Sequence, residues 1–197
     1  MLSRLLAEHV SRLNPAEISI FMVAMSINIR HMLHLKRVQL TELQISAGAD
    51  TTVISLRPIL YFLIKNPSKL VQARQEIDKV YEAGLFRNLV SHRQVRQHLP
   101  YPNASIKEAL RLHPVIGLVL ERLVPPGRAE ICGRYISGGT VVGINPCVVH
   151  YDPEIFLDRE SFEPERWLDI HGDTKRLRQM NRSFIPFGSG SRMCMGK

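Results

Sequence analysis

"FGSGSRMCMGK" runs from Phe187 to Lys197 and sets one cysteine, Cys194, in a short stretch that also holds Arg192 and three glycines. The glycines are Gly188, Gly190 and Gly196. Glycine allows backbone conformations and close approaches that a side chain would forbid, so a large planar ligand could lie against this loop. Backbone N–H groups and the charge of Arg192 would both favour the thiolate form of Cys194. The alternative is a glycine-rich surface loop with an incidental cysteine.

The composition places the chain among globular proteins, with 197 residues of which 45% are hydrophobic. Its three cysteines, Cys132, Cys147 and Cys194, are an odd number without compact spacing, which argues against a disulfide scaffold. A formal net charge of +8 would suit a nucleic-acid binder. Because the basic residues are scattered through amphipathic segments, we expect no nucleic-acid partner.

Two apolar stretches raise the question of a membrane segment. Residues 18–29 are too short to span a bilayer, and residues 45–64 are long enough but contain Asp50 and Arg57. The sequence therefore predicts no transmembrane helix in this chain.

The first half of the chain has helical periodicity. Residues 1–36 follow it, with Asn14-Pro15 as a break, and a long apolar helix is predicted over 41–65. Pro58 inside that helix predicts a kink or an early helix end. An amphipathic helix follows and closes at Gly84.

The second half mixes structure types. A helix is predicted over 103–113, and Ser105 to Glu108 also has the pattern of a capping box. Residues 129–146 predict a β-hairpin around Ser137-Gly138-Gly139. From Tyr151 onward we expect mostly ordered loop. The predicted fold class is mainly α with a small β-hairpin element.

The loop from Phe187 to Gly196 matches Phe-x-x-Gly-x-Arg-x-Cys-x-Gly at every defining position. It resembles the haem-binding signature of the cytochrome P450 haem-thiolate monooxygenases. The resemblance implies haem b as cofactor, with the Cys194 thiolate as axial ligand of the haem iron and residues 184–197 as the haem-binding loop.

Other motifs of the same family occur in the expected order. Glu108 and Arg111 resemble the family's Glu-x-x-Arg, which is buried against a later arginine, here Arg166 in "FEPERW". The resemblance gives all three a structural role. Taken without the other motifs, Glu108 and Arg111 would be read as an ordinary helix pair and not as a signature.

The stretch "AGADTT", residues 47–52, resembles the oxygen-activation motif of the family's long central helix. The resemblance makes Asp50 and Thr51 the proton-delivery pair, whereas Asp or Thr capping of a helix N-terminus is the alternative. Arg122 stands where the family carries an arginine that binds a haem propionate, as does Arg192. The alternative for Arg122 is an exposed arginine at a strand start.

The resemblance also implies the reaction. One oxygen atom of O2 enters a small organic substrate and the other leaves as water, with electrons from NADPH through NADPH-cytochrome P450 reductase. Six basic residues and no acidic one lie between Thr174 and Lys197, which suits docking of an acidic electron donor. The full-length parent would sit on the cytosolic face of the endoplasmic reticulum membrane, through an N-terminal anchor missing from this chain.

The resemblance covers residues 41–197 and is nearest to fungal members of the pisatin demethylase-like kind, which suggests a secondary-metabolism enzyme. Family chains are much longer, so residues 1–197 correspond to a partial cytochrome P450 domain, its C-terminal part. The alternative is a truncated, catalytically incompetent fragment or pseudoenzyme that does not hold haem stably. His31 and His34 lack further ligands nearby, so no zinc site is expected.

Overall fold

The computed structural model describes residues 37–86, 90–169 and 172–196. The helical pattern predicted for residues 1–36, with His31 and His34, lies outside the described residues. The chain divides into two compact units, Met1–Val53 with Cys194–Lys197, and Ile54–Met193.

Helix α3 runs from Arg37 to Lys65 and begins four residues before the predicted start at residue 41. Pro58 lies inside it, so the early helix end that Pro58 predicted is wrong. Pro58 is buried, and the partly buried side chains of Ile59, Phe62 and Leu63 pack against a cluster made of Ala109, Leu112 and Phe162. This packing offsets the roughly 3 kcal/mol that an interior proline costs a helix.

Residues Ala47–Lys65 of α3 form the one candidate membrane span among the described helices, with a mean hydropathy of 1.2. The finding rests on length and composition alone. The core helix of a soluble protein passes the same test, and the absence of a transmembrane helix in this chain stays a prediction.

Helix α4 runs from Pro67 to Glu82, and its first residue is a proline, which the helix start tolerates because its N–H would have no partner there. The chain leaves α4 through Gly84, which has a φ of +70° and donates its N–H to Tyr81 O. Helix α5, His92–His98, begins with a capping box formed by Ser91 and Gln94.

Helix α6, Pro100–Leu112, begins three residues before the predicted start at residue 103. The turn-forming prolines 100 and 102 lie in its first turn, where missing N–H groups cost nothing. Ser105 is therefore interior, and its hydroxyl donates to Tyr101 O. The predicted capping box from Ser105 to Glu108 is wrong.

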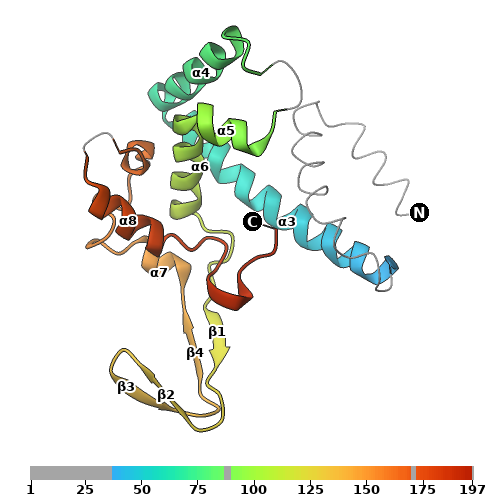
Figure 1. Ribbon diagram of the computed structural model, residues 1–197, viewed down its shortest axis with the longest axis vertical. Helices are drawn as coiled ribbons and strands as arrows, with labels where there is room; N and C mark the ends of the chain where they lie inside the picture. The colour runs from blue at the N-terminus through green and yellow to red at the C-terminus, as the bar shows by residue number, and fades with distance from the viewer. Residues whose placement is uncertain (1–36, 87–89, 170–171, 197) are drawn as a thin grey trace. The chain divides into compact units, whose positions relative to one another are not determined.

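The strands form two antiparallel pairs (Figure 1). Strand β1, Leu120–Leu123, pairs with β4, Val141–Ile144, and β2, Arg128–Ile131, pairs with β3, Arg134–Ser137. The connection between β2 and β3 is Cys132-Gly133, with φ of 51° and 75°, as two-residue hairpin turns prefer.

The hairpin predicted around Ser137-Gly138-Gly139 is therefore wrong in its turn position. These residues lead from β3 to β4, and the Gly138 N–H donates to Gly127 O. A Cβ on Gly138 would lie 2.7 Å from Pro125 O, so glycine serves a close backbone approach here.

The last third of the chain contains more helix than predicted. It holds α7, Pro146–His150, the 3₁₀ turn η1, Pro164–Trp167, α8, Thr174–Ser183, and η2, Gly190–Arg192. The prediction of mostly ordered loop after Tyr151 missed α8, which Asp173 caps by accepting from the Arg176 N–H. The observed fold is mainly α with a small β element, as predicted.

Helix α6 organises the unit of residues 54–193, since it contacts α4, α5, α7 and η1 (Figure 1). Two buried clusters form on it. One is built on Ala109, Leu112 and Phe162, and the other on Ala104, Phe156, Trp167 and Met180. The buried polar residues of the same helix, Glu108 and Arg111, belong to the candidate site.

Candidate functional site

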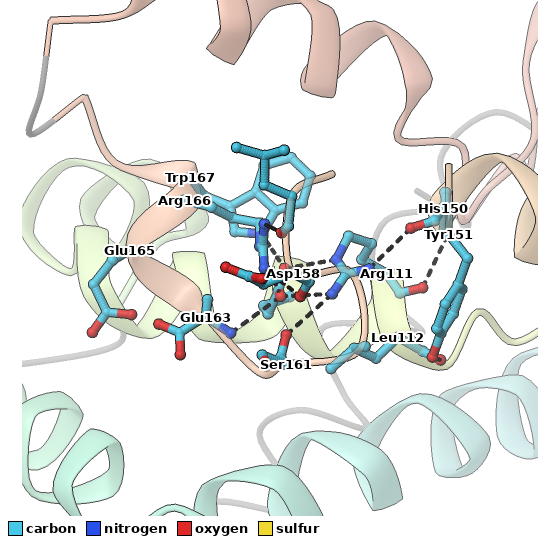
Figure 2. Close-up of polar contacts among 12 residues, drawn as sticks. Arg111, Leu112, His150, Tyr151, Asp158, Ser161, Glu163, Glu165, Arg166 and Trp167 are labelled. Carbon is cyan, nitrogen blue, oxygen red and sulfur yellow. Dashed lines mark hydrogen bonds and ion pairs between the residues drawn. The ribbon is translucent and has the colours of Figure 1, made fainter. Parts of the chain in front are cut away.

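The carboxylate of Glu108 is fully buried and accepts hydrogen bonds from five N–H groups. Arg111 donates from Nε at 3.0 Å and from Nη2 at 2.8 Å, and Arg166 donates from Nε at 2.9 Å. The Trp167 indole N–H at 2.8 Å and the Glu163 backbone N–H at 3.1 Å complete the set. Figure 2 shows Arg111, Arg166 and Trp167 converging on this point.

Local structure explains how these groups meet. Glu108 and Arg111 are three residues apart in α6 and so share a face of the helix. Turn η1 brings Arg166 and Trp167 back to that face. A buried charge is tolerated only when it is paired and hydrogen-bonded, and no buried side-chain N or O atom among the described residues lacks a partner.

The two arginines also bind the loops around them. Arg111 Nη1 donates to His150 O at 2.9 Å, and Arg166 Nη1 donates to Leu157 O. The Glu108 cluster, defined as Glu108, Arg111, Arg166 and Trp167, therefore ties α6 to α7 and to the segment between α7 and η1 (Figure 2).

Lys69 of α4 binds two glutamates at the start of η1. Its Nζ lies 2.8 Å from both Glu163 Oε2 and Glu165 Oε2, and the Tyr101 hydroxyl donates to Glu165 Oε1 at 2.9 Å. Burial alone would raise the pKa of Glu165, but the hydrogen bonds from Lys69 and Tyr101 and the Lys69 charge outweigh it and lower that pKa.

The predicted haem-binding loop contains two left-handed glycines. Gly188 has a φ of +74° and Gly190 one of +73°, so both need glycine for their conformation. The Gly188 N–H donates to Ile185 O at 3.0 Å, and Phe187 between them is partly buried. The backbone after Phe187 is therefore bent tightly as it enters the loop.

Cys194 and Gly196 follow in the other unit of the chain. The Cys194 thiol is free and exposed, and a Cβ on Gly196 would lie 3.8 Å from the Cys194 sulfur, an ordinary contact. Gly196 is thus required neither by space nor by a left-handed φ in this structure.

Asp50 and Thr51 are both exposed on α3. The Thr51 hydroxyl donates to Ala47 O at 2.6 Å, one turn back in the same helix, so this side chain bonds to the helix backbone without ending the helix. A Cβ on Gly48 would meet nothing within 4 Å. The capping alternative for Asp50 and Thr51 does not hold, since both lie well inside α3.

Arg122 and Arg192 are exposed. Arg122 lies in β1 and donates from Nη1 to Glu121 O at 2.6 Å, and Arg192 ends η2. The structure thus brings together Glu108, Arg111 and Arg166 of the predicted residues. It presents Arg122 and Arg192 to solvent.

The donor set fits a haem better than a bare metal ion. Within the described part of the chain, no three His, Cys, Asp or Glu side chains gather to hold a metal. Cys194 can supply a single soft thiolate ligand, so an iron bound there must bring its other ligands with it. A porphyrin ring does so.

The comparison with known families settles the relationship. The cytochrome P450 family model matches residues 2–197. The chain belongs to the cytochrome P450 family. The resemblance drawn from the Cys194 loop is thereby confirmed.

Relatives of the chain include fungal cytochrome P450 enzymes. A cytochrome P450 monooxygenase from Aspergillus terreus (strain NIH 2624 / FGSC A1156) is 45% identical over 154 residues, which cover 78% of this chain and 31% of that protein. A pisatin demethylase from Fusarium vanettenii is 42% identical over 160 residues, 81% of this chain and 30% of that protein. The chain therefore spans about a third of the length of these P450 relatives.

Sequence reasoning missed Trp167 as a partner of Glu108. The indole follows Arg166 directly in "PERW", and an aromatic residue there predicts only core packing. The only signal was that a buried tryptophan N–H needs an acceptor, and the sequence does not say which group supplies it.

Proposed function

We propose that this chain carries the haem-binding part of a monooxygenase that inserts one oxygen atom of O2 into an organic substrate. The observation that carries the proposal is Cys194, an exposed free thiol within the family's haem-binding pattern. NADPH would supply the electrons through NADPH-cytochrome P450 reductase.

Haem, when bound, would supply the chemistry of O2 activation. Cys194 would hold its iron as a thiolate, and the two left-handed glycines would let the backbone pass close to the ring face. Phe187 and Gly196 complete the loop that carries the thiolate.

Arg122 and Arg192 would bind the haem propionates. A guanidinium offers parallel N–H donors that match a carboxylate, and both side chains are exposed. This assignment rests on their positions in the family pattern.

Asp50 and Thr51 would deliver protons to the oxygen atom that leaves as water. The Thr51 hydroxyl donates to Ala47 O, and in this assignment, which rests on the family pattern of residues 47–52, its oxygen would also orient a water molecule. The exposed Asp50 carboxylate can take up protons from solvent and pass them along that water.

The reductase would dock near α8. Lys175, Arg178 and Arg182 of this helix are exposed, and the stretch from Thr174 to Lys197 contains no acidic residue. Attraction between this surface and an acidic donor would speed their encounter and weaken with salt. The full-length protein would lie at the endoplasmic reticulum membrane.

The second candidate is a chain that does not hold haem stably by itself. Leu60, Tyr61 and Ile64 of α3 are 59%, 54% and 68% exposed, which is unusual for large apolar side chains of a core helix. Such a surface supports the view that the described residues alone leave part of the core uncovered.

A haem titration separates the two candidates. The wild type, Cys194→Ser and the control Cys132→Ser, which changes an exposed thiol in the β2–β3 turn, are each titrated with haem and passed through gel filtration. The proposal expects one haem to stay with the wild type and with Cys132→Ser, and to be lost or weakly held by Cys194→Ser. Equal retention by all three would contradict the role of Cys194.

A further inference from the structure

His150 is a fully buried histidine at the end of α7 that the proposed function does not use. The Ile185 backbone N–H donates to its Nε2 at 2.9 Å, and its Nδ1 lies 3.2 Å from Arg111 O. Its own carbonyl accepts from Arg111 Nη1 at 2.9 Å. The residue thus contacts Arg111 twice and Ile185 once.

These contacts fix the tautomer of the ring. A backbone N–H can only donate, so Nε2 is the unprotonated nitrogen, and Nδ1 carries the proton that it donates to the Arg111 carbonyl. The ring of Phe184 stacks on the imidazole at 5.5 Å, and Phe156 meets it edge-on at 6.5 Å. The imidazole therefore has one orientation, set from α6 on one side and from the segment after α8 on the other.

Ile185 connects the imidazole to the haem-binding loop through its two backbone hydrogen bonds. Its N–H is held by His150, and its carbonyl accepts the Gly188 N–H at 3.0 Å. The turn at Gly188, with its φ of +74°, begins there. Cys194 follows Ile185 by nine residues in the sequence.

We propose that His150 is a positioning residue for the thiolate: its imidazole couples the buried Glu108 cluster to the backbone at Ile185, from which the Cys194 loop departs. The proposal rests on the proposed function, in which Cys194 binds haem iron. His150 touches neither haem nor substrate in this assignment. It acts through the backbone at Ile185.

Protonation of Nε2 would break the coupling, because the imidazolium would then present a donor to the Ile185 N–H. The charged groups that face the imidazole are Arg111 and Glu108 of α6, while the rings of Phe156 and Phe184 cover it from the other elements. Burial lowers the pKa of His150 to about 4, and the Arg111 charge also lowers it, against the raising effects of the Arg111 carbonyl and of Glu108. The coupling is therefore intact at neutral pH and lost in acid.

The test uses the haem-loaded full chain and three variants. His150→Asn places an amide where Nδ1 was and does not reach Ile185, whereas His150→Gln places an amide oxygen where Nε2 was and can still accept from the Ile185 N–H. His113→Gln is the matched control, since His113 is exposed at the end of α6. Two properties are measured from pH 3 to pH 8: hydrogen exchange at the Ile185 amide, and the red-shifted Soret band of the reduced carbon monoxide complex.

We expect exchange at Ile185 to be about tenfold faster or more in His150→Asn, with wild-type protection largely kept in His150→Gln and fully kept in His113→Gln. We also expect His150→Asn to lose the red-shifted band at a higher pH than the wild type. If His150→Asn does not fold, the wild type itself decides: protection of Ile185 and the red-shifted band must be lost together as the pH falls.

Two results would overturn this inference and leave the proposed function intact. One is unchanged exchange at Ile185 in folded His150→Asn, and the other is loss of the band at the same pH in His150→Asn and the wild type. In the wild type, loss of the band without loss of Ile185 protection would do the same. A wild type without any red-shifted band would contradict the proposed function, and with it the role of His150 toward the thiolate.

Discussion

The Trp167 indole N–H donates to Glu108 Oε2 at 2.8 Å, so the carboxylate that pairs with the buried Arg111 and the partly buried Arg166 also binds a neutral aromatic donor. Through this bond the cluster of ionic groups is joined to the apolar cluster around Phe156 and Met180. A change of Glu108 should therefore destabilise the polar and the apolar parts of the core together.

Glu108→Gln keeps the shape of the side chain but removes its charge. Arg111 and Arg166 are then left without their anion, and one amide hydrogen faces their donors. We expect the free energy of unfolding to fall by about 3–5 kcal/mol, measured by urea unfolding with far-ultraviolet circular dichroism. Glu130→Gln, on the exposed surface of β2, is the control and should change it by less than about 0.5 kcal/mol. A loss below about 1 kcal/mol for Glu108→Gln would contradict the role of the cluster.

Trp167→Phe removes one donor to Glu108 and keeps most of the ring packing against Phe156 and Phe184. A hydrogen bond to a charged group predicts a loss of about 1.5–3 kcal/mol in unfolding free energy. Trp167→Ala, which also opens a cavity, should cost more, about 3–5 kcal/mol. Equal stability of Trp167→Phe and the wild type would show that the indole N–H is dispensable.

Lys69→Met removes both ion pairs to Glu163 and Glu165. Because the pKa of Glu165 lies below its ordinary value of 4.5 in the folded chain, its contribution to stability is present above pH 4.5 and lost as the pH falls through the lowered pKa. We expect Lys69→Met to lower the free energy of unfolding by about 1–2 kcal/mol at pH 7, as measured by urea unfolding. In the variant this free energy should also depend less on pH as the pH falls below 4.5. Lys79→Met, exposed on the same helix, is the control.

The burial of His150 predicts a second dependence of stability on pH, over a different pH range. The unfolded chain binds a proton at this residue below its ordinary pKa of 6.5, whereas the folded chain does so only below about 4. Stability is therefore highest above pH 6.5 and falls by roughly 3 kcal/mol on going to pH 4.

Urea unfolding of the wild type and His150→Gln at each pH isolates this effect, since the variant has no titrating group at position 150. The wild type should be more stable at pH 7, and its advantage should shrink as the pH falls toward 4. A constant difference across this range would rule out a neutral buried His150.

Several parts of the fold were readable from sequence because local chemistry decides them. The long apolar helix and the helix closed by Gly84 follow from periodicity and stop residues. The β2–β3 turn was misplaced because Ser137-Gly138-Gly139 is the stronger turn pattern, while the actual turn uses Cys132 with a positive φ. Helix α8 was missed because only Leu177 and Met180 of its ten residues are apolar, although polar and apolar side chains are strongly segregated to opposite faces of the helix.

The candidate site also contains residues that the sequence predicts and residues that it does not. Glu108, Arg111 and Arg166 form a spacing pattern that sequence can show, and the structure brings them together. Trp167 and His150 could not be predicted as their partners, because an indole N–H and an imidazole find their acceptors and donors only through tertiary packing. In His150 both partners are backbone groups, which no residue type reveals.

The proposed function depends most on Cys194 as a thiolate ligand of haem iron, and one spectrum tests that role most directly. The chain is loaded with haem, reduced under carbon monoxide, and compared with Cys194→Ser. We expect a strongly red-shifted Soret band in the wild type that Cys194→Ser abolishes. An unshifted band in the wild type, or a red-shifted band that survives in Cys194→Ser, would contradict it.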